Sequence, residues 1–278
     1  MSIIKISDEF KKEMIKKFSC SNEQENFDYL HSKSFHNLIN NSKKLLTLNR
    51  YVLIKNVGFV ENKQLFELFV KQFGNYYGVV EETDIKMECD YTGCTDKLIE
   101  LHNDDAIDLK TQPDYGFIQI QQEDPLRLAR NGIVIISELV RYLEVYNVEL
   151  LQKFYEVKIP MLSFGVNYDD KDKTLLELKE PILYKKSNQT LVRFDLTRVK
   201  FYYKYKNLIQ SKEESFLIDE FLYYAKKFRR EFYLEKGDIL IHNNKQTLHD
   251  RTECSFELNS DGSFKTRRIY VSFAREKL

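Results

Sequence analysis

The sequence predicts a mixed α+β fold, in which a double-stranded β-helix (jelly-roll) core carries an N-terminal helical section and inserted helices. Short apolar runs typical of strands recur from residue 51 to the C-terminus, residues 1–48 show helical periodicity, and further helical patterns interrupt the strands. Only 4 prolines and 9 glycines punctuate the 278 residues, and no linker-like tract divides them. We therefore expect a single domain spanning residues 1–278.

The N-terminal section, residues 1–48, is expected to pack on the core. Phe10, Met14 and Phe18 recur every four residues behind Ser7, and residues 27–46 continue in the same way. This spacing places apolar side chains on one face of a helix.

A strand and a helix follow this section. The apolar run 51–54 is typical of a buried strand, and Leu65, Phe69 and Phe73 mark one face of a helix that Gly74 is expected to close.

The remaining elements alternate between strands and helices. Strands are predicted at residues 118–121, 132–136, 232–234, 239–241 and 268–274, with a turn at 236–238. Ser137 is the expected N-cap of a helix over 138–146, and Ser211 with Glu214 forms a capping box before another helix.

Composition restricts the partners. Forty-three basic and forty-three acidic side chains cancel, so no overall field favours nucleic acid or an anionic membrane. No apolar run of about 18 residues and no signal-peptide pattern is present, so we expect a cytoplasmic protein with a small neutral or zwitterionic partner. The four cysteines form no CxxC pair, which predicts reduced thiols.

Two separated segments contain residues that suit a metal site. His102 and Asp104 are two residues apart, so on a strand they project to one face and can reach the same ion. A third ligand could come from His242 or His249. We favour His249, because His242 continues a buried strand pattern whereas His249 lies in a polar stretch. Two histidines and one carboxylate would leave three positions open on an octahedral iron(II).

The segments 237–244 and 248–251, read Gly-Asp-Ile-Leu-Ile-His-Asn-Asn and Leu-His-Asp-Arg, resemble the distal-histidine region of the taurine dioxygenase and clavaminate synthase-like families. Leu101-His102-Asn103-Asp104 resembles the His-x-Asp/Glu motif of the same families, which are iron(II)/2-oxoglutarate oxygenases. The chain departs from the pattern at Asp250, where glycine is usual, and at Asn243, where aspartate is frequent.

This resemblance implies an iron(II)- and 2-oxoglutarate-dependent dioxygenase that hydroxylates a C–H bond and releases succinate and CO2. His102, Asp104 and His249 would hold iron, O2 would be the second co-substrate, and an arginine would bind the distal carboxylate of 2-oxoglutarate through its planar fork. Arg267 and Arg268 are the candidates. The strand pattern around Tyr270 favours Arg268, which would leave Arg267 solvated or directed towards substrate.

Family analogy points to a free or carrier-bound amino acid as the substrate. Glu88, Asp90, Arg193 and Asp195 are candidate contacts, because they are charged residues in polar stretches.

Two alternative functions remain open. One is a jelly-roll hydrolase or isomerase that uses another metal. The other is a nucleic-acid-binding module, because residues 199–206 interleave lysines with aromatic side chains.

Overall fold

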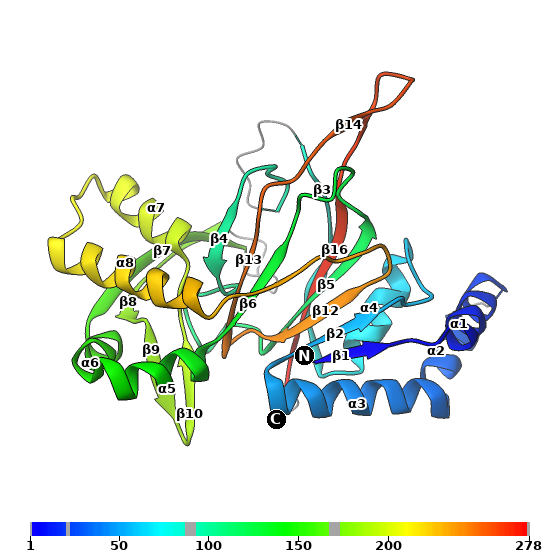
Figure 1. Ribbon diagram of the computed structural model, residues 1–278, viewed down its shortest axis with the longest axis horizontal. Coiled ribbons are helices and arrows are strands. Elements are labelled where there is room, and N and C mark those ends of the chain that lie inside the picture. Colours follow the sequence, from blue (N-terminus) through cyan, green and yellow to red (C-terminus); the bar gives the residue numbers. More distant parts are fainter. Residues whose placement is uncertain (1, 21–22, 87–92, 167–172, 277–278) are drawn as a thin grey trace.

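The computed structural model describes residues 2–20, 23–86, 93–166 and 173–276. Two sheets, one antiparallel and one mainly antiparallel, lie at the centre, and helices flank them on both sides (Figure 1). The expected mixed fold of helices and antiparallel sheets is therefore confirmed.

The larger sheet has six strands in the order β1 (Ile3–Lys5), β2 (Tyr51–Lys55), β12 (Ile239–Asn243), β5 (Tyr115–Gln122), β16 (Arg268–Arg275) and β3 (Asn75–Asp84). Only β1 and β2 pair in parallel. The short β1 was not predicted, because three residues are too few to show a period.

The smaller sheet has four antiparallel strands in the order β11 (Arg230–Phe232), β6 (Asn131–Ile135), β13 (Thr247–Arg251) and β4 (Ile99–His102). It packs on the larger sheet through one apolar cluster. Ile133, Ile135 and Phe232 contribute from the smaller sheet, and Leu53 and Leu240 from the larger. Burial of such side chains stabilises each of them by roughly 1.5–3 kcal/mol and fixes the distance between the sheets.

The N-terminal helices cover the outer face of the larger sheet. They are α1 (Asp8–Cys20), α2 (Glu23–Leu30), α3 (Lys33–Asn49) and α4 (Lys63–Lys71). Met14, Phe35 and Phe69 join Phe117 and Ile241 in one core cluster. Helices are thus present behind Ser7 and around Leu65 and Phe69, where the sequence predicts them.

A second group of helices lies at the other end of the molecule (Figure 1). It contains α5 (Ile136–Tyr146), α6 (Val148–Glu156), α7 (Leu196–Lys206) and α8 (Lys212–Lys227), together with the strand pairs β7 (Lys158–Val166) with β8 (Lys173–Pro181) and β9 (Leu183–Lys186) with β10 (Gln189–Val192). A small hairpin, β14 (Glu257–Leu258) and β15 (Phe264–Lys265), projects at the top of the view in Figure 1.

One of the predicted helix ends is confirmed and two are wrong. The capping box of Ser211 and Glu214 is confirmed at the start of α8. The prediction for Ser137 is wrong, because α5 already begins at Ile136 and its backbone N–H donates to Gln246. Gly74 does not close α4 either, since the cap is Gln72 in right-handed conformation. Glycine is required at 74 for space, because a Cβ there would lie 2.0 Å from the Arg275 carbonyl oxygen.

The cysteines and the apolar segments complete the description. Cys94 is disulfide-bonded, so the expectation of four reduced thiols is wrong, whereas Cys254 is free and buried. Within the described parts of the chain, no helix has both the length and the apolar character needed to span a membrane.

Candidate metal centre

His102 and His249 face each other across a strand pair. They are register partners in the antiparallel pairing of β4 with β13, and their ring centroids lie 4.3 Å apart. Opposed residues of antiparallel strands project to the same face. The strand pairing therefore brings together two imidazoles that are far apart in the sequence.

Asp104 lies in the turn that follows β4. The buried side-chain amide of Asn244 fixes its backbone: Asn244 Oδ1 accepts from the Asp104 N–H at 2.9 Å, and Asn244 Nδ2 donates to the Asp104 carbonyl oxygen, also at 2.9 Å. Asn103 donates in turn to the carbonyl oxygens of Asn244 and Val192, and accepts from the Phe194 N–H. This amide clasp orients the carboxylate toward the histidines.

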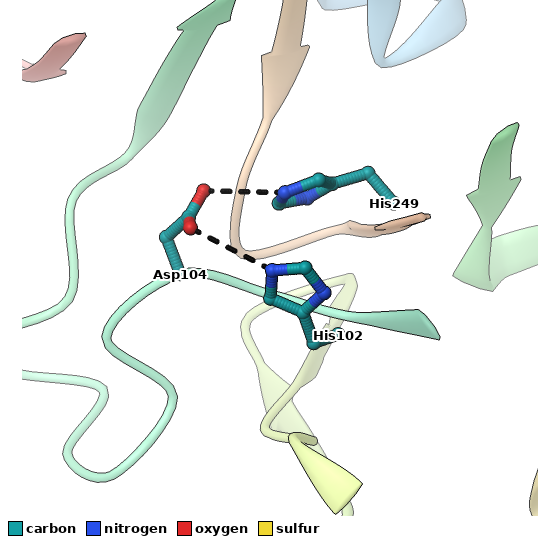
Figure 2. Close-up of side chains that lie close together, drawn as sticks. All are labelled: His102, Asp104 and His249. Atoms are coloured by element: carbon teal, nitrogen blue, oxygen red, sulfur yellow. Dashed lines mark ion pairs between the residues drawn. The ribbon is translucent and has the colours of Figure 1, made fainter. Parts of the chain in front are cut away.

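Figure 2 shows the carboxylate of Asp104 directed at both rings. Asp104 Oδ1 lies 3.9 Å from His102 Nε2, and Asp104 Oδ2 lies 3.6 Å from His249 Nε2. One donor atom from each residue lies within 4.8 Å of the others. Two ligand bonds of about 2.0–2.2 Å span at most about 4.4 Å, so small side-chain rotations are enough to bring the three atoms to one ion. The set is a candidate metal centre.

The ring nitrogens are oriented for metal binding. His102 Nδ1 lies 2.8 Å from the Glu100 carbonyl oxygen, which can only accept, so Nδ1 donates to it and Nε2 is the nitrogen that faces Asp104. Burial, and then the neighbouring His102, lower the pKa of His249 well below its ordinary value. The His249 ring is therefore neutral at physiological pH and can act as a ligand.

A cavity of about 450 Å³ adjoins these three residues. Its walls come from both sheets and from α7, and they include Ile269, Val271 and Phe273 of β16. A space of this size can take two small organic molecules beside an ion.

Arg267 lines this cavity and Arg268 does not, which corrects the predicted preference. Arg267 is only 3% exposed and donates to Asn131 Oδ1 at 2.9 Å. Arg268 lies on the other face of β16, near Glu61 and Glu82. The prediction assumed that Tyr270 points toward the cavity. Instead Tyr270 packs on Phe66 of α4, on the outer face of the sheet, so the even-numbered residues of β16, including Arg268, point away from the cavity.

Burial lowers the pKa of Arg267 to about 10, which leaves the guanidinium charged at neutral pH. No carboxylate within the described parts of the chain forms an ion pair with it. A buried cation without an acidic partner is costly, and it indicates a binding position for an anionic ligand.

The candidate substrate contacts have different outcomes. Glu88 and Asp90 lie outside the described residues. Arg193 is fully buried and donates to the carbonyl oxygens of Ile107, Ile159, Glu180 and Leu178, so it is structural and the prediction of substrate contact is wrong. The sequence shows only a charged residue in a polar stretch, whereas the five donors of the guanidinium join buried backbone segments.

Asp195 does line the cavity, as N-cap of α7. Beside it the structure places Arg198 and Asp105, which were not predicted. Arg198 lies 3.1 Å from Asp195 and 3.5 Å from Asp105, and burial raises the pKa of Asp105 although Arg198 opposes this. The i, i+3 spacing of Asp195 and Arg198 was the available signal.

Asp250, the departure from glycine, also borders the cavity. Its Oδ2 accepts from Arg229 Nε at 2.6 Å, and Gly132 makes room for it, because a Cβ at 132 would lie 2.2 Å from Asp250 Oδ1. Burial raises its pKa, against the effect of Arg229. The pair Arg229–Asp250 therefore compensates a buried charge next to His249.

The segment 199–206, considered as a nucleic-acid platform, is the body of α7. Val199 is buried, Tyr203 packs against the core, and Lys206 forms an ion pair with Glu177 at 2.7 Å. The bases and aromatics thus point in different directions around a helix, which disfavours stacking of successive bases on one face.

Solved structures of similar fold are iron oxygenases. Asparagine oxygenase in complex with Fe(II), 3-hydroxyasparagine and succinate has a TM-score of 0.72 at 14% identity, over 99% of this chain and 94% of that chain. The non-heme iron oxygenase OrfP with Fe, succinate and (3S)-hydroxy-L-Arg has a TM-score of 0.71 at 13% identity, over 100% and 95%. OrfP with Fe and alpha-ketoglutaric acid gives 0.69 at 13% identity, over 99% and 94%.

No family model matches the sequence, and no curated protein matches it either. At such identities the likeness establishes the fold. The chain has the fold of these non-heme iron oxygenases, as the resemblance implied.

Proposed function

We propose that this protein is an iron(II)- and 2-oxoglutarate-dependent dioxygenase that hydroxylates an amino acid or a similar small zwitterion. The observation that carries the proposal is the convergence of His102, Asp104 and His249 at the edge of a cavity that also contains the buried cation Arg267. The fold likeness to asparagine oxygenase and OrfP supports it.

The donor set fits iron(II). Two imidazoles and one carboxylate are the ligands of the 2-His-1-carboxylate class, and the cavity leaves space for further ligands on the open side. When bound, iron(II) supplies the activation of dioxygen that couples oxidative decarboxylation of 2-oxoglutarate to insertion of one oxygen atom into a C–H bond, giving succinate, CO2 and the hydroxylated product.

Arg267 is proposed to bind the distal carboxylate of 2-oxoglutarate, in place of the predicted Arg268. Its guanidinium can donate two charge-assisted hydrogen bonds to one carboxylate, and Asn131 holds it in place from the side. The apolar side chains of Ile269 and Val271, on the same face of β16, exclude water from the space between this arginine and the metal ligands.

The substrate is proposed to lie at the α7 end of the cavity. Arg198 offers a cation for a carboxylate, while Asp195 and Asp105 offer acceptors for an ammonium group. Charges of both signs within one small polar cluster suit a zwitterion better than a uniformly charged ligand.

We further propose that the two central sheets form a double-stranded β-helix and that residues 1–278 are one domain. The shared core of Met14 and Phe35 with Ile241 supports the inclusion of residues 1–48, because these helices have no separate core.

The test is 2-oxoglutarate turnover. Purified protein with iron(II), ascorbate and oxygen, offered a panel of free amino acids, should form succinate together with a product heavier by one oxygen atom. His249→Ala should abolish both signals, whereas His36→Ala, at an exposed position of α3, should leave them unchanged. Succinate formation that persists in His249→Ala would contradict the site, and metal-dependent hydrolysis or isomerisation without succinate would favour the other enzyme class.

A further inference from the structure

His242 lies directly behind the candidate metal centre and is completely buried. Its ring centroid is 4.6 Å from that of His249, and it borders the same cavity. A polar ring at this position on a buried strand is unusual, because each of its nitrogens requires a partner or costs free energy.

The tautomer of His242 follows from its neighbours. Its Nδ1 lies 3.2 Å from Thr247 Oγ1, and the hydroxyl proton of Thr247 is already donated to the Asn243 carbonyl oxygen at 2.9 Å. Thr247 Oγ1 can therefore only accept from the ring, so Nδ1 carries the proton. With the single ring proton on Nδ1, Nε2 of His242 holds the lone pair.

That lone pair has no hydrogen-bond partner within the described residues. A nitrogen of the adjacent His249 ring also has no hydrogen-bond partner there. His249 Nδ1 is also buried and unpaired. When His249 presents the lone pair of Nε2 to a metal, its single proton must reside on Nδ1, which then becomes a donor. The two unpaired nitrogens are therefore complementary: His249 Nδ1 is a donor, His242 Nε2 is an acceptor, and the two rings are in contact.

Gly116 keeps the space for this ring. It is the register partner of His242 in the pairing of β5 with β12, and a Cβ at 116 would lie 2.4 Å from His242 Nε2. The His242 ring therefore fits beside His249 only because residue 116, its strand partner, has no side chain.

We propose that His242 is the positioning residue of the metal centre: its Nε2 accepts a hydrogen bond from His249 Nδ1, directly or through one water, and so fixes the tautomer and orientation of His249 for metal binding. This role rests on the proposed function, because it requires His249 to be a ligand. The chain Thr247–His242–His249 then orients the ligand in the way that a carboxylate or carbonyl orients other metal-bound histidines.

Co(II) binding to the protein tests this role without turnover. His242→Leu removes the acceptor and should weaken Co(II) binding by about 10- to 100-fold in a calorimetric titration. His242→Gln keeps an acceptor oxygen near the position of Nε2 and should stay within a few-fold of wild type. His36→Leu, on the exposed side of α3, is the matched control and should bind normally. Thermal unfolding of the metal-free proteins shows whether each variant remains folded.

The outcomes separate the two proposals. Unchanged Co(II) affinity in folded His242→Leu, with wild-type 2-oxoglutarate turnover intact, would overturn the role of His242 alone. Equal losses in His242→Leu and His242→Gln would also overturn it, because the ring itself would then be required, as a packing element or as a ligand. Wild-type protein that binds no Co(II) would overturn the metal centre and this role together.

Discussion

Exchange of Arg267 for glutamine should have opposite effects on the free protein and on co-substrate binding. In the free protein Arg267 is 3% exposed, and its guanidinium donates a hydrogen bond to Asn131. Its pKa of about 10, against an ordinary value of about 12.5, corresponds to a cost on the order of 3 kcal/mol for keeping the charge in the fold at neutral pH. Arg267→Gln relieves this cost and loses about 1 kcal/mol for the hydrogen bond.

The expected Tm of metal-free Arg267→Gln is therefore equal to that of wild type or a few degrees higher. The affinity for 2-oxoglutarate should fall instead. Truncation of one partner of a buried, hydrogen-bonded charge pair costs about 2–5 kcal/mol, which is roughly a 30- to 5000-fold increase in Kd.

Anaerobic calorimetric titration of the iron(II)-loaded protein with 2-oxoglutarate measures the affinity, and differential scanning calorimetry measures the Tm. Arg268→Gln is the matched control, because Arg268 lies next to Arg267 in the sequence but faces Glu61 and Glu82 outside the cavity. It should keep wild-type affinity. A loss of affinity in Arg268→Gln but not in Arg267→Gln would refute the assignment, and a Tm several degrees lower in Arg267→Gln would show that its charge is compensated in the free protein.

Three further predictions concern the scaffold. Arg193→Lys should destabilise the protein by about 3–5 kcal/mol in urea unfolding, since lysine cannot reach the four carbonyl oxygens that the guanidinium joins; a variant with altered substrate preference and full stability would contradict this. Gly116→Ala should cost about 1–3 kcal/mol by the clash with His242, and the double variant with His242→Val should recover most of it; the absence of recovery would place the strain elsewhere. Ser211→Ala should cost about 1 kcal/mol and lower Tm by roughly 2–4 °C, and an unchanged Tm would mean that the capping box contributes nothing.

The sequence was sufficient to predict elements whose signal is local. The strands at 51–54 and 239–241 and the capping box at Ser211 were predictable, because apolar runs and cap residues act through neighbours in the chain. The approach of Arg275 to Gly74 was not predictable, because it depends on the arrangement of strands that are distant in the sequence.

The candidate site shows the same division. His102, Asp104 and His249 were found from their order and spacing, and the structure brings them together through the β4–β13 pairing. The prediction of Arg268 rather than Arg267 was wrong, because a correct choice required knowing which face of β16 packs on α4. The contact of His242 with His249 depends on the approach of two different sheets, so a residue read as an ordinary buried imidazole lies within reach of the metal ligands.

The amide clasp of Asn103 and Asn244 holds Asp104 and also bonds the backbone of Val192 and Phe194, directly before α7. Arg198 and the later residues of α7 that line the cavity form no bond of this clasp. Exchange of α7 residues can thus alter which molecule is admitted while the reactive centre keeps its geometry. Under the proposed function, the α7 residues after Asp195 would determine which substrate binds while the clasp holds the metal ligand, and a laboratory search for new substrates should begin with randomised α7 positions after Asp195.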